Sequence, residues 1–266
     1  MSKVWILILV LFSCNSFAAP KSELWSYWDV HSQSKQSIDH SQWQSILDTY
    51  LVTQGDLTLF RYSSVTTADK QRLKNYLASL ANIDPRQYSK AEQYAYWVNL
   101  YNGLTVQLIL DNYPVKSITK LGGLFSFGPW GDKLLSVTGK SLTLNDIEHR
   151  ILRPIWNDPR THYAVNCASL GCPNLQPQAF TAQNTEQLLT QSAKAFINSE
   201  KGVKVSNGAL QLSSIYDWFA VDFGGKKGVL QHIAQYRDDL ATADKLATFN
   251  GKITYDYDWQ LNETAK

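Results

Sequence analysis

A long apolar stretch between Ser89 and Asn112 constrains the fold more than any other feature of the sequence. Ser89 and Glu92 have the spacing of a helix capping box, and Pro114 prevents a helix from continuing far beyond Asn112. The apolar side chains between these ends cover a wide arc of the helix, so that little of its surface can contact water. They include Tyr94, Trp97, Val98, Tyr101, Leu104, Leu108 and Ile109. The sequence therefore predicts a central helix around which the rest of the chain packs.

Other segments have the periodicity of shorter helices and strands. Amphipathic spacing predicts helices over about 41–51, 68–80, 143–153, 185–199, 214–219 and 228–236. Hairpins are expected over 134–142 and 203–212, with further strands over 162–168 and 253–257. Helices and hairpins that do not alternate as βα units indicate an α+β fold. We expect a helix-rich single domain packed on a small, mainly antiparallel sheet.

The N-terminus has the pattern of a signal peptide. Lys3 precedes an unbroken apolar run from Val4 to Phe12, which is too short to span a bilayer. Small residues at Ser16 and Ala18 favour cleavage before Ala19, which predicts an exported protein, periplasmic or secreted. The expected organisation is a signal peptide over 1–18, an extension with a first helix over 19–66, and the main domain over 67–266.

Two other interpretations of the N-terminus remain open. The segment Leu11-Phe12-Ser13-Cys14 resembles a lipobox, which would anchor the protein through a lipid on Cys14, although bulky Phe12 fits that pattern poorly. The segment could also remain uncleaved. No later stretch has the length and hydropathy of a transmembrane span.

Composition limits the classes of partner. Hydrophobic residues make up 44% of the chain and charged residues 18%, as expected for a globular protein. The 25 Lys and Arg residues are scattered and nearly balanced by 23 Asp and Glu residues. This pattern disfavours nucleic acid and acidic membranes as partners, so that a small molecule or a peptide is the expected ligand.

The segment 160–173 contains His162, Cys167 and Cys172. In an oxidising compartment the two cysteines most simply form a disulfide, which would contribute about 2 kcal/mol for so small a loop. The alternatives are a reactive or metal-binding thiol, with His162 as the basic neighbour, and two inert thiols. Zinc has weak support because no paired ligand spacing is present, and no metal or cofactor is predicted. On a regular strand His162 and Cys167 would point to opposite faces.

Three polar residues fall on faces that the pattern buries. Asn99 and Asn102 lie in the apolar central helix, where each amide must be paired, either to pin a neighbouring loop or to line a site. Glu148 shares a face with Leu152 and is expected to point inward, towards Arg153, Arg160 or His162. The neighbouring residue His149 is expected to face solvent. His31, His40 and His232 have polar neighbours and are expected at the surface.

Five blocks of sequence together resemble the domain-of-unknown-function family 547. They span 95–104, 146–153, 158–173, 218–224 and 257–262, in the family's order. The resemblance covers about Lys70 to Asn262 and implies membership without an activity. Members also occur in plants and animals as parts of larger intracellular proteins, which implies that Cys167 and Cys172 need not be kept for a disulfide.

Two functional hypotheses follow. The first is a cysteine-dependent hydrolase or acyl transferase with Cys167 as nucleophile, His162 as base, Glu148 as orienting group and Asn99 or Asn102 as oxyanion donors. Its histidine precedes the cysteine, unlike in papain-like enzymes, so a permuted arrangement is required. The second is a non-catalytic envelope binding or scaffold module with an aromatic groove for a peptide, glycan or lipid. That groove would contain Trp97, Trp130, Trp218 and Trp259.

Overall fold

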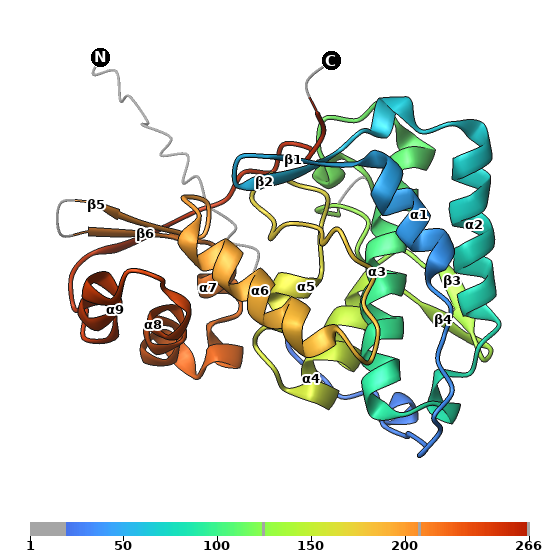
Figure 1. Cartoon of the computed structure of the whole chain (residues 1–266), viewed down its shortest axis with the longest axis horizontal. Coiled ribbons are helices and arrows are strands. Elements are labelled where there is room, and N and C mark those ends of the chain that lie inside the picture. Colours follow the sequence, from blue (N-terminus) through green and yellow to red (C-terminus); the bar gives the residue numbers. More distant parts are fainter. Residues whose placement is uncertain (1–19, 124–125, 207–208, 265–266) are drawn as a thin grey trace, which may run out of the picture.

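The central helix α3 (Lys90–Asn112) organises the fold in the computed structural model, which describes residues 20–123, 126–206 and 209–264 (Figure 1). The hydroxyl of Ser89 accepts a hydrogen bond from the Glu92 amide at 3.3 Å, as the capping pattern predicts. The Glu92 carboxylate does not return to Ser89 and instead accepts the amide of Ile38 at 2.7 Å. The cap therefore also attaches the N-terminal extension to α3. The predicted signal peptide lies outside the described residues.

The N-terminal part of the chain packs around α3. It comprises α1 (Ser41–Tyr50), β1 (Leu51–Gln54), β2 (Leu57–Phe60), α2 (Thr67–Ala81), β3 (Leu135–Val137) and β4 (Lys140–Leu142). The hydroxyl of Thr66 caps α2 by accepting the Asp69 amide at 3.1 Å. Both helices and the β3–β4 hairpin agree with the sequence predictions, whereas the antiparallel β1–β2 hairpin was not predicted.

The C-terminal part forms a smaller layer of helices on a three-stranded sheet. It comprises α6 (Thr185–Asn198), β5 (Val203–Ser206), β6 (Ala209–Ser213), α7 (Ile215–Trp218), α8 (Gly225–Tyr236), α9 (Leu240–Ala247) and β7 (Ile253–Asp256). Strands β5 and β6 are antiparallel, and β7 adds to β6 in parallel. The fold is α+β with small sheets, as predicted, although helix α9 was not. The turn of the β5–β6 hairpin lies outside the described residues.

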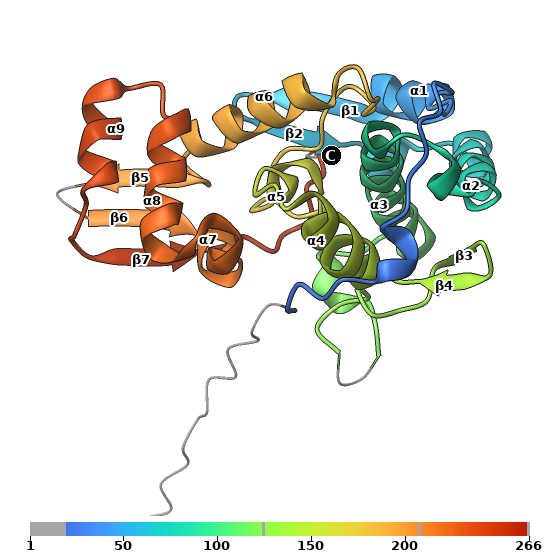
Figure 2. The same ribbon diagram turned by 90° about the horizontal axis from the view of Figure 1, so that it is seen from below.

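Two hydrophobic clusters correspond to these two parts, at opposite ends of the molecule (Figures 1 and 2). The larger cluster surrounds α3, and the smaller lies between α6, α8 and the C-terminal sheet. Helix α6 belongs to both, since Leu188 packs in the larger cluster and Phe196 in the smaller. The π-helix η5 (Asp146–Leu152) contributes Ile147 to the larger cluster, and α4 (Arg153–Trp156) follows it directly. Helix α5 (Thr161–Ala164) joins the clusters, since Ala164 packs in the larger one and Tyr163 in the smaller. The helix predicted over 143–153 was expected to end at Pro154, but this residue lies in the first turn of α4 and the helical segment continues to Trp156.

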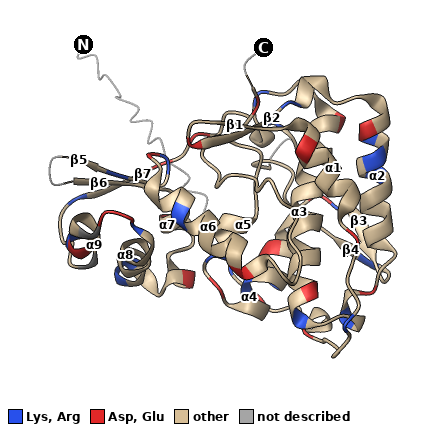
Figure 3. Ribbon diagram, in the orientation of Figure 1, with Lys and Arg blue, Asp and Glu red and all other residues tan. Residues whose placement is uncertain are grey.

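Charged residues are spread over the elements without a large region of one sign (Figure 3). In the described ranges no helix has the length and hydropathy needed to cross a membrane. Two expectations for histidines were wrong. His40 is 5% exposed and bonds the Tyr76 hydroxyl through Nδ1 at 2.7 Å, and the Nε2 of His232 is buried beside the ring of Tyr163. His31 is exposed, as expected.

Candidate functional site

A cavity of about 590 Å³ opens where the two hydrophobic clusters meet. Residues from α3, η5, α5, α7 and the C-terminal segment contribute to its wall. The lining includes Trp130, Glu148, His149, His162, Cys167, Cys172, Trp218, Phe219, Tyr257 and Trp259. The cavity thus contains three of the site residues predicted from the sequence, namely Cys167, His162 and Glu148.

Asn102 bends the chain that carries His162 and Cys167. Its amide nitrogen donates to the Ala164 carbonyl at 2.9 Å, and its amide oxygen accepts the Asn166 N–H at 2.8 Å. The prediction of a strand over 162–168 was wrong, because Thr161–Ala164 forms the helical turn α5 and the chain becomes extended only at Val165. Because the segment is not a regular strand, its side chains do not alternate between two faces, and His162 and Cys167 need not point in opposite directions. Both residues line the same cavity.

Asn99 makes the same kind of contact elsewhere. Its amide donates to the Phe180 carbonyl at 2.7 Å and accepts the Phe180 N–H at 3.0 Å. Neither Asn99 nor Asn102 is among the described residues that line the cavity. These bonds are those of the loop-pinning interpretation, and a role of either amide as an oxyanion donor remains a prediction.

Cys167 and Cys172 form a disulfide with their Cα atoms 6.1 Å apart, which confirms the expected bridge. Asn166 shapes the loop between them, since its side chain accepts the Ala168 N–H at 2.9 Å and donates to the Pro173 carbonyl at 2.8 Å. Ala168 has φ of 57°, in the left-handed region that side chains disfavour. The loop therefore has a defined shape that the surrounding hydrogen bonds impose.

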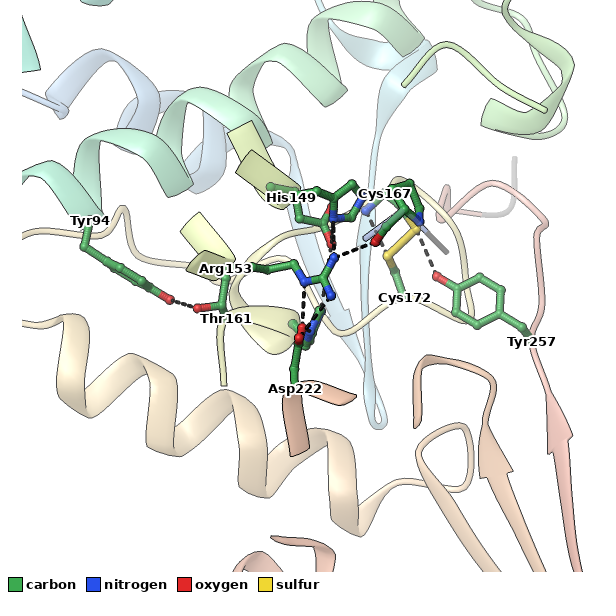
Figure 4. A network of polar contacts seen from close by, with 11 residues as sticks. Tyr94, His149, Arg153, Thr161, Cys167, Cys172, Asp222 and Tyr257 are labelled. Carbon is green, nitrogen blue, oxygen red and sulfur yellow. Dashed lines mark hydrogen bonds and ion pairs between the residues drawn. A yellow bond between two sulfur atoms is a disulfide. The ribbon is translucent and has the colours of Figure 1, made fainter. Parts of the chain in front are cut away.

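Hydroxyl groups surround the sulfur of Cys167. The Tyr257 hydroxyl lies 3.0 Å from this sulfur and the Ser169 hydroxyl 3.1 Å from it (Figure 4). Ser169 also donates to the Tyr257 oxygen at 3.2 Å. The Cys172 sulfur accepts the Cys167 N–H at 2.8 Å. Within the described part of the chain, neither sulfur is hydrogen-bonded to an imidazole.

The π-helix η5 directs both Glu148 and His149 towards the cavity. Glu148 is buried, as predicted, but His149 is only 5% exposed, so the expectation that it faces solvent was wrong. A π-helical turn is wider than an α-helical turn, which changes the angles at which successive side chains leave the helix. Nδ1 of His149 accepts a hydrogen bond from Arg153 at 2.9 Å. Burial lowers the pKa of His149 to about 4, so its ring is neutral near pH 7.

His162 lies between two carboxylates. Its Nε2 is 2.7 Å from the Asp222 carboxylate, while Nδ1 lies 3.8 Å from the carboxylate of Glu148. Glu148 was expected to pair with Arg153, Arg160 or His162, and His162 is the nearest of the three. Arg153 instead pairs with Asp222 (Figure 4). The face of the His162 ring stacks on Phe219, with centroids 4.2 Å apart.

Asp222 contacts two side chains of this network, the guanidinium of Arg153 and the imidazole of His162. Arg153 donates to its two oxygens at 2.6 and 3.0 Å. Burial alone would raise the pKa of Asp222, but the hydrogen bonds from His162 and Arg153 outweigh burial and hold it below its usual value. The sequence analysis did not select Asp222, because nothing local shows that it reaches a histidine sixty positions earlier.

Aromatic side chains gather in one part of the cavity lining, the aromatic wall. Trp259 contacts Trp218 and Trp130, with ring centroids 5.7 and 5.8 Å apart. Tyr257 packs against Trp259 at 4.5 Å between centroids. Three of the four tryptophans predicted to form a groove therefore lie together. Trp97 does not belong with them, because it is fully buried in the larger cluster.

Among the described residues, no group of three or more His, Cys, Asp or Glu side chains is placed to hold a metal ion. The cavity lining combines a carboxylate, two imidazoles, a disulfide and several aromatic rings.

Comparison with known proteins finds one protein family that matches part of the chain. Residues 85–197 match the family model described as "Protein of unknown function, DUF547". The resemblance to DUF547 is confirmed over these residues. The DUF547 match includes α3, η5, α5 and the disulfide loop, whereas Asp222, Tyr257 and Trp259 lie beyond it. No curated protein and no solved structure matches the chain.

Proposed function

We propose that this protein binds a small organic cation whose ammonium group is attached to an apolar body. The observation that carries this proposal is the charge of the cavity. Among the described residues that line it, Glu148 is the only Asp, Glu, Lys or Arg. Arg153 lies outside the lining and is neutralised by Asp222.

The aromatic wall has the chemistry that such a cation requires. The faces of tryptophan and tyrosine attract cations within about 6 Å of the ring centroid, most strongly where water is excluded. Trp130, Trp218, Tyr257 and Trp259 supply these faces in the same cavity lining as Glu148. Since His149 is neutral near pH 7, it does not cancel the negative charge of its neighbour Glu148. A peptide side chain, a modified sugar or a lipid headgroup that carries an ammonium group would share this chemistry.

A cysteine-dependent hydrolase or acyl transferase is the second candidate. It is supported by the presence of Cys167, His162 and Glu148 in one cavity. The closed disulfide and the backbone partners of Asn99 and Asn102 favour the binding function instead. The enzyme hypothesis requires that reduction produce hydrolysis of an activated ester. This hydrolysis should disappear in Cys167→Ser, and an equal rate in that variant would contradict the hypothesis.

Calorimetry with choline and its neutral isostere 3,3-dimethylbutan-1-ol tests the proposed ligand class. We expect choline to bind at least about tenfold more tightly, and Glu148→Gln to reduce this preference because the carboxylate is lost and only the aromatic faces still attract the cation. Glu200→Gln is the matched control, because Glu200 is exposed and lies outside the cavity lining. Equal affinity for both probes, or an unchanged preference in Glu148→Gln, would contradict the proposal.

We also propose that the protein is exported and begins at Ala19. Ser16 and Ala18 provide the small side chains that signal peptidase requires, and Pro20 disfavours cleavage at the next bond. The intact mass of the exported protein measures the cleavage site directly. A mass that includes diacylglycerol on Cys14 would show a lipid-anchored protein instead.

A further inference from the structure

We propose that Cys167 and Cys172 are a redox-active pair that exchanges with thiols and disulfides entering the cavity. Exchange is a different activity from cation binding, although Tyr257 contributes to both, with its ring in the aromatic wall and its hydroxyl at the Cys167 sulfur. The disulfide lies in the lining of the cavity, so a small thiol compound can reach it. Cys167 is 9% exposed and Cys172 is 4% exposed, which makes Cys167 the better placed of the two for attack.

The loop that carries the pair does not depend on the disulfide for its shape. Asn166 holds the loop at both ends, through Ala168 and Pro173. Lys201 donates to the carbonyl of Cys172 at 2.6 Å and to that of Leu170 at 3.3 Å. Because these bonds do not involve sulfur, the two cysteines stay adjacent after reduction. A cysteine pair held in this way can be reduced and reoxidised repeatedly. A structural disulfide would instead join segments that no other contact holds together.

The C-terminal segment fixes the same loop from the other side. The Gly171 N–H donates to the Asp258 carbonyl at 2.8 Å, and Ser169 forms a bridge with Leu261. A Cβ atom at Gly171 would lie 2.7 Å from the Asp258 nitrogen, so this close approach requires glycine. The loop is therefore attached to neighbouring chain on two sides.

Donors placed at both sulfurs stabilise the thiolates that exchange requires. A disulfide sulfur carries no hydrogen, so the Tyr257 hydroxyl is the donor in its contact with Cys167. Burial raises the pKa of Tyr257, which keeps this hydroxyl protonated and able to donate at neutral pH. The Cys167 N–H serves Cys172 in the same way. Hydrogen bonds to a thiolate favour the charged form and lower the pKa of the thiol.

The exchange conserves atoms and electrons. A substrate thiol loses its proton to water, and its sulfur attacks Sγ of Cys167; the Sγ–Sγ bond breaks, and its electron pair leaves on Cys172, where the Cys167 N–H stabilises it. A second substrate thiolate then attacks the substrate sulfur of this mixed disulfide. It releases the oxidised substrate disulfide, while Cys167 leaves as the thiolate that Tyr257 stabilises. Two thiols are oxidised and one protein disulfide is reduced. The reverse sequence reduces a substrate disulfide.

Trapping the mixed disulfide identifies the attacked sulfur. Reduced Cys172→Ser should react with oxidised glutathione to give a stable glutathione adduct on Cys167, measured by intact mass. Reduced Cys167→Ser should form its adduct at Cys172 at least about tenfold more slowly, because Cys172 is more buried and lacks the Tyr257 donor. Reduced wild-type protein should return to the disulfide and release two glutathione molecules. Equal, slow reaction of the two variants would overturn the proposal.

The pH profile of alkylation tests the donor. In Cys172→Ser, iodoacetamide should react with Cys167 at a midpoint below the ordinary thiol pKa of about 8.5. Adding Tyr257→Phe keeps the aromatic ring but removes the hydroxyl, so the midpoint should rise by about one unit, with about tenfold slower alkylation at pH values below it. Tyr255→Phe on strand β7 is the control, because Tyr255 is outside the cavity lining. An ordinary midpoint that Tyr257→Phe leaves unchanged would also overturn the proposal.

A folding defect in the cysteine variants does not prevent the test. Reduced wild-type protein can be alkylated briefly and digested, and the modified fractions of the Cys167 and Cys172 peptides compared. Preferential modification of Cys167 supports the proposal, and equal modification contradicts it.

Discussion

Replacing Asn102 with leucine tests whether this amide is a structural pin. The two residues have similar size, but leucine can neither donate to the Ala164 carbonyl nor accept the Asn166 N–H. Asn102 is 2% exposed, so water cannot replace the lost partners. The substitution therefore leaves one carbonyl and one N–H group unpaired in the interior.

The expected loss of stability follows from these two groups. Each unpaired buried group costs about 1 to 3 kcal/mol, which gives about 4 kcal/mol for the pair. Burial of a leucine side chain offsets up to about 2 kcal/mol of this loss. We therefore expect a net loss of about 2 kcal/mol or more. For a chain of this size, that corresponds to a decrease in Tm of about 4 to 8 °C.

Urea unfolding followed by circular dichroism measures this change directly. Asn112→Leu is the matched control, because Asn112 is exposed on the same helix and its side chain bonds only its own helix, at Leu108. We expect the control to change stability by less than about 0.5 kcal/mol. If Asn102→Leu unfolds at the same urea concentration as the wild type while ligand binding changes, the amide is a site residue and the reasoning is refuted.

Three further changes have defined outcomes. Gly171→Ala should destabilise the fold by about 2 kcal/mol in urea, because the new Cβ meets the backbone of Asp258; an unchanged midpoint would contradict the close approach. Asp222→Asn should cost about 3 kcal/mol near pH 7 by leaving Arg153 unpaired. Because the pKa of Asp222 is lowered, its ionised form stabilises the fold above about pH 4, and this stability is lost as the pH falls further. The difference in unfolding free energy between wild type and Asp222→Asn should therefore narrow in urea titrations towards pH 3. A difference that stays constant with pH would argue against the ion pair. Burial lowers the pKa of His40 to about 4, so stability should fall as the pH decreases from about 6.5 to 4, and His40→Gln should flatten that slope; an equally steep slope in the variant would assign it to other groups.

Much of the helical framework could be predicted because its signals are local. Ser89 caps its helix as the sequence pattern predicts, and the apolar arc of α3 is buried as expected. These features depend on residues a few positions apart. The hairpin β1–β2 has no such signal, since its strands pair with each other and bond distant segments at Asn174 and at Glu263.

The segment 162–168 shows where local reasoning failed. A short apolar run has the same composition in a buried strand and in a buried helical turn. Here the partner that decides is Asn102, more than sixty positions earlier, which bonds the backbone on either side of Val165. The prediction of a strand separated His162 from Cys167, whereas the bend brings both to one cavity.

Some residues of the candidate site could be selected from the sequence and others could not. Cys167, His162 and Glu148 were selected because their chemistry is unusual in an apolar context. Asp222 and Tyr257 were missed because an aspartate and a tyrosine are ordinary residues until the fold places them against His162 and the Cys167 sulfur. His149 was assigned to solvent because an α-helical turn was assumed where the chain forms a π-helix.

The position of Tyr257 and Trp259 in the chain also sets the order in which the cavity is built. A ribosome or an export channel delivers the protein from its N-terminus, so that α3, the disulfide loop and α6 emerge before these aromatic residues. Until residues 257–262 pack against residues 168–171, the Cys167 sulfur lacks its hydroxyl donor and the aromatic wall is incomplete. The ligand binding that we propose therefore requires the last segment to have docked. Before that step, the same two sulfurs are open to oxidation by any partner that the emerging chain meets.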